Sequence, residues 1–209
     1  MTSALELAKR GGLDAVTVRA VAAQTGVSVG MVQYCFDDKE ELVVAMADQL
    51  VKELSSSARR TFDTLPDQPD LRGRQGVYLL LRTGLEWGWP AIEANPERRL
   101  LTYEITTHAL RHRAAGSTRA GAIAVEQRER MTAEVADFLE ECAQRTRTSW
   151  AEPVSAITRF GLAALDGLVL RWLVDRDTEA MNYHLDGLAR IIADKAVDAP
   201  PAGRSAGGE

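Results

Sequence analysis

A chain of 209 residues, of which 45% are hydrophobic and 26% charged, can bury one sizeable core or two modest ones, so we start from a globular protein. Its longest apolar stretch, residues 160–174, is too short and too charged to span a bilayer, and the first ten residues do not resemble a secretion signal. We therefore expect a cytoplasmic protein. The isolated Cys35 and Cys142 argue against a disulfide framework or a structural zinc site, and the net charge of −5 gives no global sign of nucleic-acid binding.

Helical periodicity runs along almost the whole chain, and no segment alternates apolar and polar residues as a half-buried strand does. The pattern predicts an all-α fold. In the N-terminal part a Gly11-Gly12 pair ends the first helix, and Thr17 and Ser28 are residues that typically cap helix N-termini. The helices predicted here are 2–10, 18–24, 28–34 and a long helix over 38–60.

Prolines divide the rest of the chain. Pro66 and Pro69 indicate a boundary near residue 60, and Pro90 is expected to stop a helix at Trp89. The helices predicted beyond the boundary are 71–89, 96–113, 118–146, 153–174 and a last one around 181–192. We expect domains over 1–60 and 61–198, and a disordered tail over 199–209.

Residues 17–36 have the arrangement of a helix-turn-helix, in which two short helices are joined by a turn that contains glycine. Gly26 permits the turn, small Ala22 and Ala23 suit a close helix crossing, and Val27 is expected to pack with the two helices. Spacing alone does not distinguish a DNA-binding motif from an ordinary turn between helices. The local charge is one positive unit, since residues 1–36 hold three cations and two anions.

The residues expected to face DNA lie mainly on the second of these helices. Gln33 suits an adenine edge and Val29 a thymine methyl group, whereas Ser28, Tyr34 and Lys39 suit phosphate contacts. The full set of predicted DNA-binding residues is Thr17, Arg19, Ser28, Val29, Gly30, Gln33, Tyr34 and Lys39.

The blocks TVRAVA at 17–22, GVSVGMV at 26–32 and KEEL at 39–42, with Phe36 between the last two, resemble the signature of the tetracycline-repressor (TetR) family. The resemblance covers about residues 5–42, and the motif is most similar to the branch of choline-responsive BetI-type repressors. It implies a homodimeric repressor that binds a partly palindromic operator and releases it when a small effector enters the larger domain. The first helix is shorter than is usual in the family, and Gln33 replaces an aromatic residue.

An effector pocket is expected between the helices over 71–89, 96–113 and 118–146. Aromatic rings with a few polar groups suit an amphipathic or aromatic effector, and Glu104 would favour a cation. The candidate lining residues are Trp87, Trp89, Tyr103, Glu104, Thr107, His108 and Phe138. Each of them is also compatible with a place in the core or on the surface.

The stretch over residues 160–174 is apolar all round its helix and must be buried on several sides. Paired with the last helix, it would form a two-fold, four-helix interface between protomers, although a core within one chain is the alternative. The candidate interface residues are Phe160, Ala164, Gly167, Leu168, Trp172, Leu185 and Leu188.

Other functions fit the sequence less well. No phosphate-binding glycine loop or Gly-x-Ser-x-Gly turn is found, and His108, His112 and His184 are interpreted as too scattered to form a site, so we expect no enzyme, cofactor or metal. The alternative is a helical protein that binds a small molecule or a partner but not DNA. In the repressor hypothesis, effector binding tilts the helix over 38–60 and so changes the distance between the two DNA-binding helices of the dimer. The sequence is also compatible with an activator of transcription.

Overall fold

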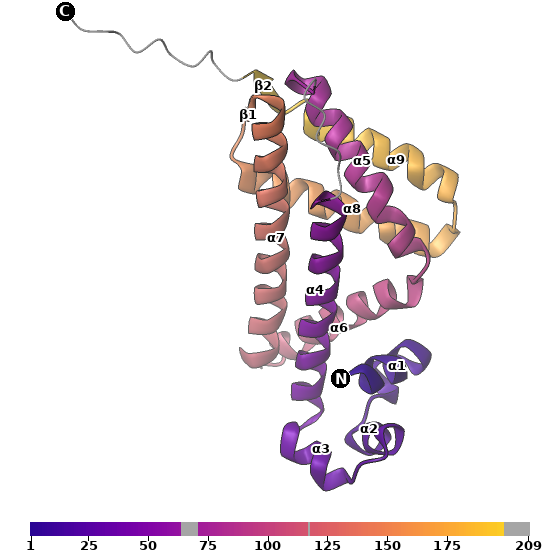
Figure 1. Ribbon diagram of the computed structural model, residues 1–209. Coiled ribbons are helices and arrows are strands. Elements are labelled where there is room, and N and C mark those ends of the chain that lie inside the picture. The colour runs from indigo at the N-terminus through magenta and orange to yellow at the C-terminus, as the bar shows by residue number, and fades with distance from the viewer. Residues whose placement is uncertain (64–70, 117, 199–209) are drawn as a thin grey trace, which may run out of the picture. The chain divides into compact units, whose positions relative to one another are not determined.

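The computed structural model describes the backbone over residues 1–63, 71–116 and 118–198, and the side chains over 1–50, 52, 71–116, 125 and 128–198. Over these ranges the regular structure is helical apart from one short two-stranded ribbon, which confirms the predicted all-α class (Figure 1). The predicted linker prolines and the tail over 199–209 lie outside the described residues. Within the described part, no helix is long and apolar enough to cross a membrane.

The chain divides into two compact units, one made of residues 1–60 with 88–131 and the other of 61–87 with 132–209. The first unit therefore contains the predicted domain over 1–60 and adds a second stretch of chain. Its elements are α1 (Thr2–Gly11), the 3-10 helix η1 (Leu13–Ala15), α2 (Val18–Thr25), α3 (Val29–Cys35), most of α4 (Lys39–Asp63), the end of α5 (Gly73–Glu93), α6 (Pro96–Ala114) and the first part of α7 (Thr118–Thr146).

The core of the first unit forms around the N-terminal half of α4. Leu42, Met46 and Leu50 recur at four-residue spacing, so they lie on one face of the helix, and each is at most 2% exposed. They share one buried cluster with Leu5 of α1 and Ile105 of α6. Because α4 begins shortly after α3 ends, this packing fixes the point at which the pair α2 and α3 joins the core.

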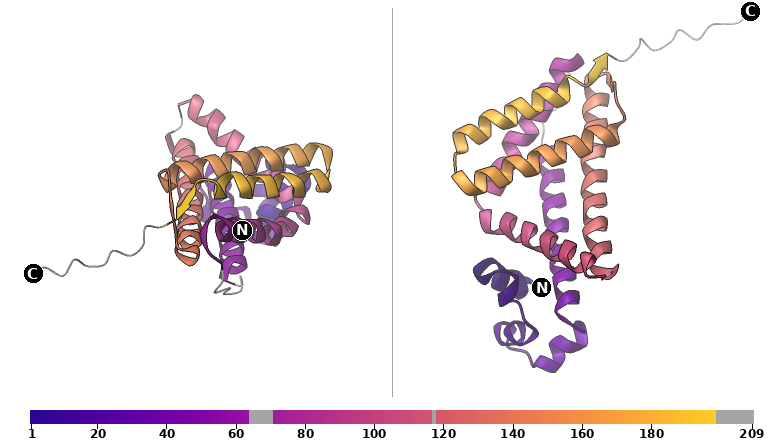
Figure 2. Two further views of the ribbon diagram at one scale, coloured as in Figure 1. Left: turned by 90° about the horizontal axis from the view of Figure 1, so that it is seen from above. Right: turned by 180° about the vertical axis from the view of Figure 1, so that it is seen from behind.

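The second unit contains most of α5 (Gly73–Glu93), the last part of α7, and the pair α8 (Val154–Asp175) and α9 (Thr178–Ala193). Helices α8 and α9 lie side by side (Figure 2). Gly161 makes this close approach possible, because a Cβ atom there would lie 3.2 Å from Cδ1 of Ile192. Strands β1 (Thr148–Trp150) and β2 (Ala196–Asp198) pair antiparallel, which ties the chain after α9 to the chain before α8.

Two features of the backbone differ from the predictions. Helix α5 continues through Pro90 to Glu93, so the expectation that it stops at Trp89 is wrong. Proline removes one amide donor, but Pro90 lies in the last turn and its carbonyl still accepts from the amide of Ala94 at 3.0 Å. The β1–β2 ribbon was not predicted, since strands of three residues are too short to show alternation.

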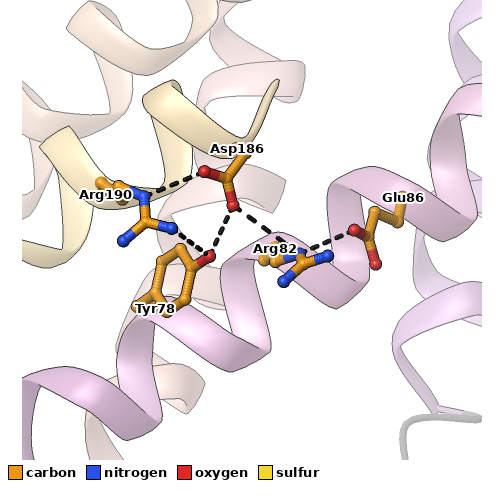
Figure 3. Close-up of polar contacts among 5 residues, drawn as sticks. All are labelled: Tyr78, Arg82, Glu86, Asp186 and Arg190. Atoms are coloured by element: carbon orange, nitrogen blue, oxygen red, sulfur yellow. Dashed lines mark hydrogen bonds and ion pairs between the residues drawn. The ribbon is translucent and has the colours of Figure 1, made fainter. Parts of the chain in front are cut away.

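A polar network joins α5 to α9 at the edge of the second core (Figure 3). The Tyr78 hydroxyl, on a side chain only 7% exposed, donates to Oδ1 of Asp186 at 2.5 Å. Arg190 donates from Nε to Oδ2 of Asp186 at 2.9 Å and from Nη2 to the Tyr78 hydroxyl at 3.0 Å. Arg82 lies 3.7 Å from Asp186 and also pairs with Glu86 at 2.7 Å. The hydrogen bond from Tyr78, and then the one from Arg190, hold the pKa of Asp186 below its ordinary value.

We predict that Tyr78→Phe lowers the free energy of unfolding by about 1 kcal/mol, because it removes a hydrogen bond to a carboxylate that is partly shielded from water. Urea unfolding at pH 7 measures the change. Tyr34→Phe is the matched control, since this tyrosine of α3 is 89% exposed. Equal unfolding midpoints for the two variants would show that the network adds nothing to stability.

Candidate nucleic-acid interface

Helices α2 and α3 are each started by a side-chain cap. The hydroxyl of Thr17 accepts from the amide of Ala20 at 3.1 Å, and that of Ser28 accepts from the amide of Met31 at 3.2 Å. Gly26 ends α2 in the left-handed conformation with a φ of 72°, which a residue with a side chain adopts only at a cost. The two short helices and their turn thus form where the sequence predicted them, and Figure 1 shows them just before α4.

The packing between α2 and α3 uses fewer residues than expected. Val21, Ala22 and Val32 are buried, at 6%, 2% and 6% exposure. Val27 is 43% exposed and Ala23 is also exposed, so the expectation that both pack at the helix crossing is wrong. Val27 lies in the turn itself, where the chain has left the surface that the two helices share.

Almost all of α3 is open to solvent. Val29 is 39% exposed and Tyr34 is 89% exposed, while Val32 alone among the residues of α3 is buried. The predicted DNA-binding residues that the structure leaves exposed are Thr17, Arg19, Ser28, Val29, Gly30, Gln33 and Tyr34. Lys39 is half-buried, and its Nζ lies 3.8 Å from Oδ1 of Asp14. Met31 was not among the predicted residues, although it lies between them on α3 and is 57% exposed.

The predicted effector residues are divided between the two units. Trp87, 46% exposed, and half-buried Phe138 belong to the second unit, where the ring of Phe138 lies against Gly84. The other five belong to the first unit, and they are Trp89, Tyr103, Glu104, Thr107 and His108. Trp89 is buried at 4% exposure.

Helix α6 has two different faces within the first unit. Leu101 and Ile105 are buried in the core that α1 and α4 share. Tyr103 and Thr107 lie on the more open side of the helix, together with Leu100 and Leu110, which are 50% and 52% exposed. Glu104 differs from its neighbours: one carboxylate oxygen accepts from the amide of Leu13 at 3.2 Å. The Glu104 carboxylate therefore already has a partner inside the chain.

His108 and His112 lie one turn apart on α6, with ring centroids 4.2 Å apart. The interpretation that the three histidines are too scattered to meet is therefore wrong for this pair, and the four-residue spacing in the sequence could have shown it. His108 also lines a shallow apolar depression between α4 and α6, formed with Val44, Ala47 and other residues. Among the described residues, no three His, Cys, Asp or Glu side chains form a group that could hold a metal.

The environment of His108 disfavours its protonated form. Burial is the main cause of its lowered pKa, followed by the neighbouring His112 and by Lys39 of α4. Glu40 of α4 and Asp14 of η1 act in the opposite direction without reversing the shift.

The candidate interface residues of α8 and α9 also differ in exposure. Phe160 is 44% exposed and Gly167 is exposed, whereas Ala164 and Leu168 are half-buried. The remaining three, Trp172, Leu185 and Leu188, are buried inside the second unit at 5%, 2% and 5% exposure. Other residues with large apolar side chains on these helices, which were not predicted, are more exposed, namely Leu170, Val174, Tyr183 and Ile191.

We predict that part of the loss of stability between pH 7.5 and pH 5.5 comes from His108. A histidine whose pKa is lowered by folding takes up a proton in the unfolded chain first, so stability falls as the pH drops below the unfolded value of about 6.5. His108→Gln should flatten the pH dependence of the urea midpoint, and His184→Gln, at an exposed position of α9, is the control. Identical slopes for wild type and His108→Gln would contradict this assignment.

Comparisons with known proteins agree with this geometry. Residues 1–46 match the model of the bacterial regulatory proteins of the tetR family. The chain is 22% identical over 193 residues, 92% of this chain and 91% of the relative, to the HTH-type nicotine-responsive transcriptional repressor HdnoR of Paenarthrobacter nicotinovorans. This relative is described as a transcriptional repressor.

Solved structures share the fold over both units. A transcriptional regulator from Rhodococcus sp. Rha1 superposes with a TM-score of 0.68 at 21% identity, covering 96% of each chain. The fatty acid degradation regulator FadR from Bacillus halodurans has a TM-score of 0.68 at 13% identity, covering 92% of this chain and 95% of the other. The helix-turn-helix region thus matches the tetR family of bacterial regulatory proteins over residues 1–46, and the rest of the chain shares its fold with solved transcriptional regulators.

Proposed function

We propose that the protein is a transcriptional repressor that binds a partly palindromic operator as a homodimer and releases it when a small molecule binds. The observation that carries this proposal is the open face of α3, where Val29, Gln33 and Tyr34 are exposed at helical spacing beside a buried Val32. A short helix that buries one side chain and exposes the others can enter the major groove of DNA.

The roles proposed for the DNA-facing residues follow from their chemistry. The amide of Gln33 can donate to and accept from an adenine edge, and Val29 can contact a thymine methyl group. Arg19 and Tyr34 are exposed on the two helices and can contact phosphates, which sets the register without reading the sequence. Lys39 contributes less, because Asp14 partly neutralises it.

For the effector we propose an amphipathic molecule with an aromatic ring, bound against the open side of α6. Tyr103 and Thr107 offer a ring and a hydroxyl there, between the exposed Leu100 and Leu110. HdnoR is described as nicotine-responsive, and nicotine combines an aromatic ring with an amine, so it is a suitable first probe. Glu104 no longer supports a cation site, because it accepts from the amide of Leu13.

For the dimer we propose an interface formed by the open faces of α8 and α9. Phe160, Leu170 and Val174 give α8 an apolar stripe, and Val174 is 78% exposed. A Cβ atom at Gly167 of α8 or at Gly187 of α9 would meet nothing within 4 Å, so neither glycine is needed for packing inside the chain. Glycine weakens a helix, and close approach by a second copy explains its presence at both sites.

We predict that the full-length chain binds a selected operator with an affinity that falls steeply as salt is raised from 50 to 200 mM, because phosphate contacts release counterions. The operator would be selected from genomic fragments and binding measured by fluorescence anisotropy. The double variant Gln33→Ala/Tyr34→Ala should bind roughly 10-fold or more weakly, and Gln144→Ala, an exposed change on α7, should bind as wild type. Failure to select any fragment would favour the alternative, a helical protein that binds a small molecule or a partner but not DNA.

We predict that Leu170→Glu/Val174→Glu converts the dimer to a monomer, since it places two charges in an apolar interface. Light scattering after size-exclusion chromatography measures the mass. Leu79→Glu is the control, because Leu79 is an exposed leucine of α5 outside this face. The monomer should also lose operator affinity, as only a dimer matches both half-sites at once. A wild-type monomer, or an unchanged mass in the variant, would refute the interface.

A further inference from the structure

The Glu104 side chain of α6 forms a hydrogen bond to the start of the chain. Its Oε2 accepts from the amide of Leu13 at 3.2 Å, across 91 residues of sequence. The contact lies at a tight corner between α1 and η1, where Gly12 has a φ of 68°. A Cβ atom on Gly12 would lie 3.3 Å from the same oxygen, so the glycine leaves just enough room for the carboxylate.

Packing holds α6 close to the same corner. Leu101 and Ile105, on the two sides of Glu104 along the helix, are buried in one cluster with Leu5 of α1 and with Leu13 itself. Arg98, which precedes Glu104 on α6, donates from Nη2 to the carbonyl of Leu50 in α4 at 3.5 Å. Helix α6 therefore contacts both the corner before α2 and the long helix after α3.

The corner is separated from α2 by very little chain. Val16 is fully buried and Thr17 caps α2, so only the short stretch 13–17 connects the Glu104 contact to the first helix of the DNA-binding pair. If a shift of α6 breaks or moves this contact, the backbone of residues 13–17 must change its conformation or pass the shift on to α2. Because Leu13 and Val16 are buried and closely packed, this segment has little freedom to change its conformation without moving α2.

We propose that Glu104 is a positioning residue that couples α6 to the DNA-binding helices by holding the α1–η1 corner. This role rests on the proposed function and deepens it. Tyr103 and Thr107, the neighbours of Glu104 on the open side of α6, are the residues proposed to face the effector. A molecule bound there displaces Glu104 from Leu13, and the orientation of α2 and α3 changes as a result. The coupling thus has a second route besides α4.

Hydrogen exchange of the free full-length protein tests the contact itself. We expect Glu104→Ala to speed exchange of the peptides over residues 12–25 by roughly 10-fold, because the Leu13 amide loses its acceptor. Glu104→Gln should restore part of the protection, since a neutral amide oxygen still accepts but binds more weakly than a carboxylate. Glu97→Gln, an exposed glutamate of the same helix, should leave these peptides unchanged. Unchanged exchange in Glu104→Ala would overturn the proposal.

Exchange in the presence of a selected operator tests the coupling. In the wild type, DNA should slow exchange in the α3 peptide and, if the two sites are coupled through Glu104, also in the α6 peptide over 101–112. In Glu104→Ala the α3 peptide should still be slowed, but the slowing of the α6 peptide should be lost. Slowing of α6 that persists in Glu104→Ala would mean that the residue has only a structural role. If DNA does not slow exchange of the α3 peptide in the wild type, DNA binding is refuted, and the coupling with it. The exchange measured without DNA would still show whether Glu104 protects the amide of Leu13.

Discussion

The packing of the apolar face of α4 against α1 and α6 is the interaction on which the first unit depends. Leu42, Met46 and Leu50 are at most 2% exposed, and burial of each such side chain contributes about 1.5–3 kcal/mol relative to exposure. Helices α2 and α3 bury only a few small residues and could not hold their positions alone. Their orientation therefore depends on this core, and the proposed coupling between α6 and the DNA-binding helices relies on the same packing.

In the second unit, helices α8 and α9 have apolar residues on both a buried side and an exposed side. One side of α8 and α9 closes the core around Ile157 and Leu188, and the Tyr78 network fastens α9 to α5 at the edge of that core. The other side keeps Phe160, Leu170 and other apolar groups open to solvent. Because the inner faces of α8 and α9 are already buried in the core of their own chain, a second copy could pack on their outer faces without disturbing that core.

Much of this structure follows from local sequence signals. The caps at Thr17 and Ser28 and the turn at Gly26 set the ends of α2 and α3, and these local rules predict the helix-turn-helix almost to the residue. Contacts between distant segments could not be predicted in the same way. Helical spacing shows that residues 160–174 are buried on several sides, but not which side faces the chain's own core. Nothing near Glu104 in the sequence indicates that its partner is the amide of Leu13.

The central claim is that two copies of α3 are presented together at the spacing of operator half-sites. The native cysteines allow a direct measurement, because Cys35 is exposed at the end of α3, whereas Cys142 is buried and burial raises the pKa of its thiol to about 12. A spin label on Cys35 gives the distance between the two helices by pulsed electron paramagnetic resonance. We expect one narrow distance near a helical turn of DNA, about 34–36 Å, with a selected operator bound. The absence of a dipolar signal, or a distance that operator DNA leaves unchanged and far from this value, would contradict the account.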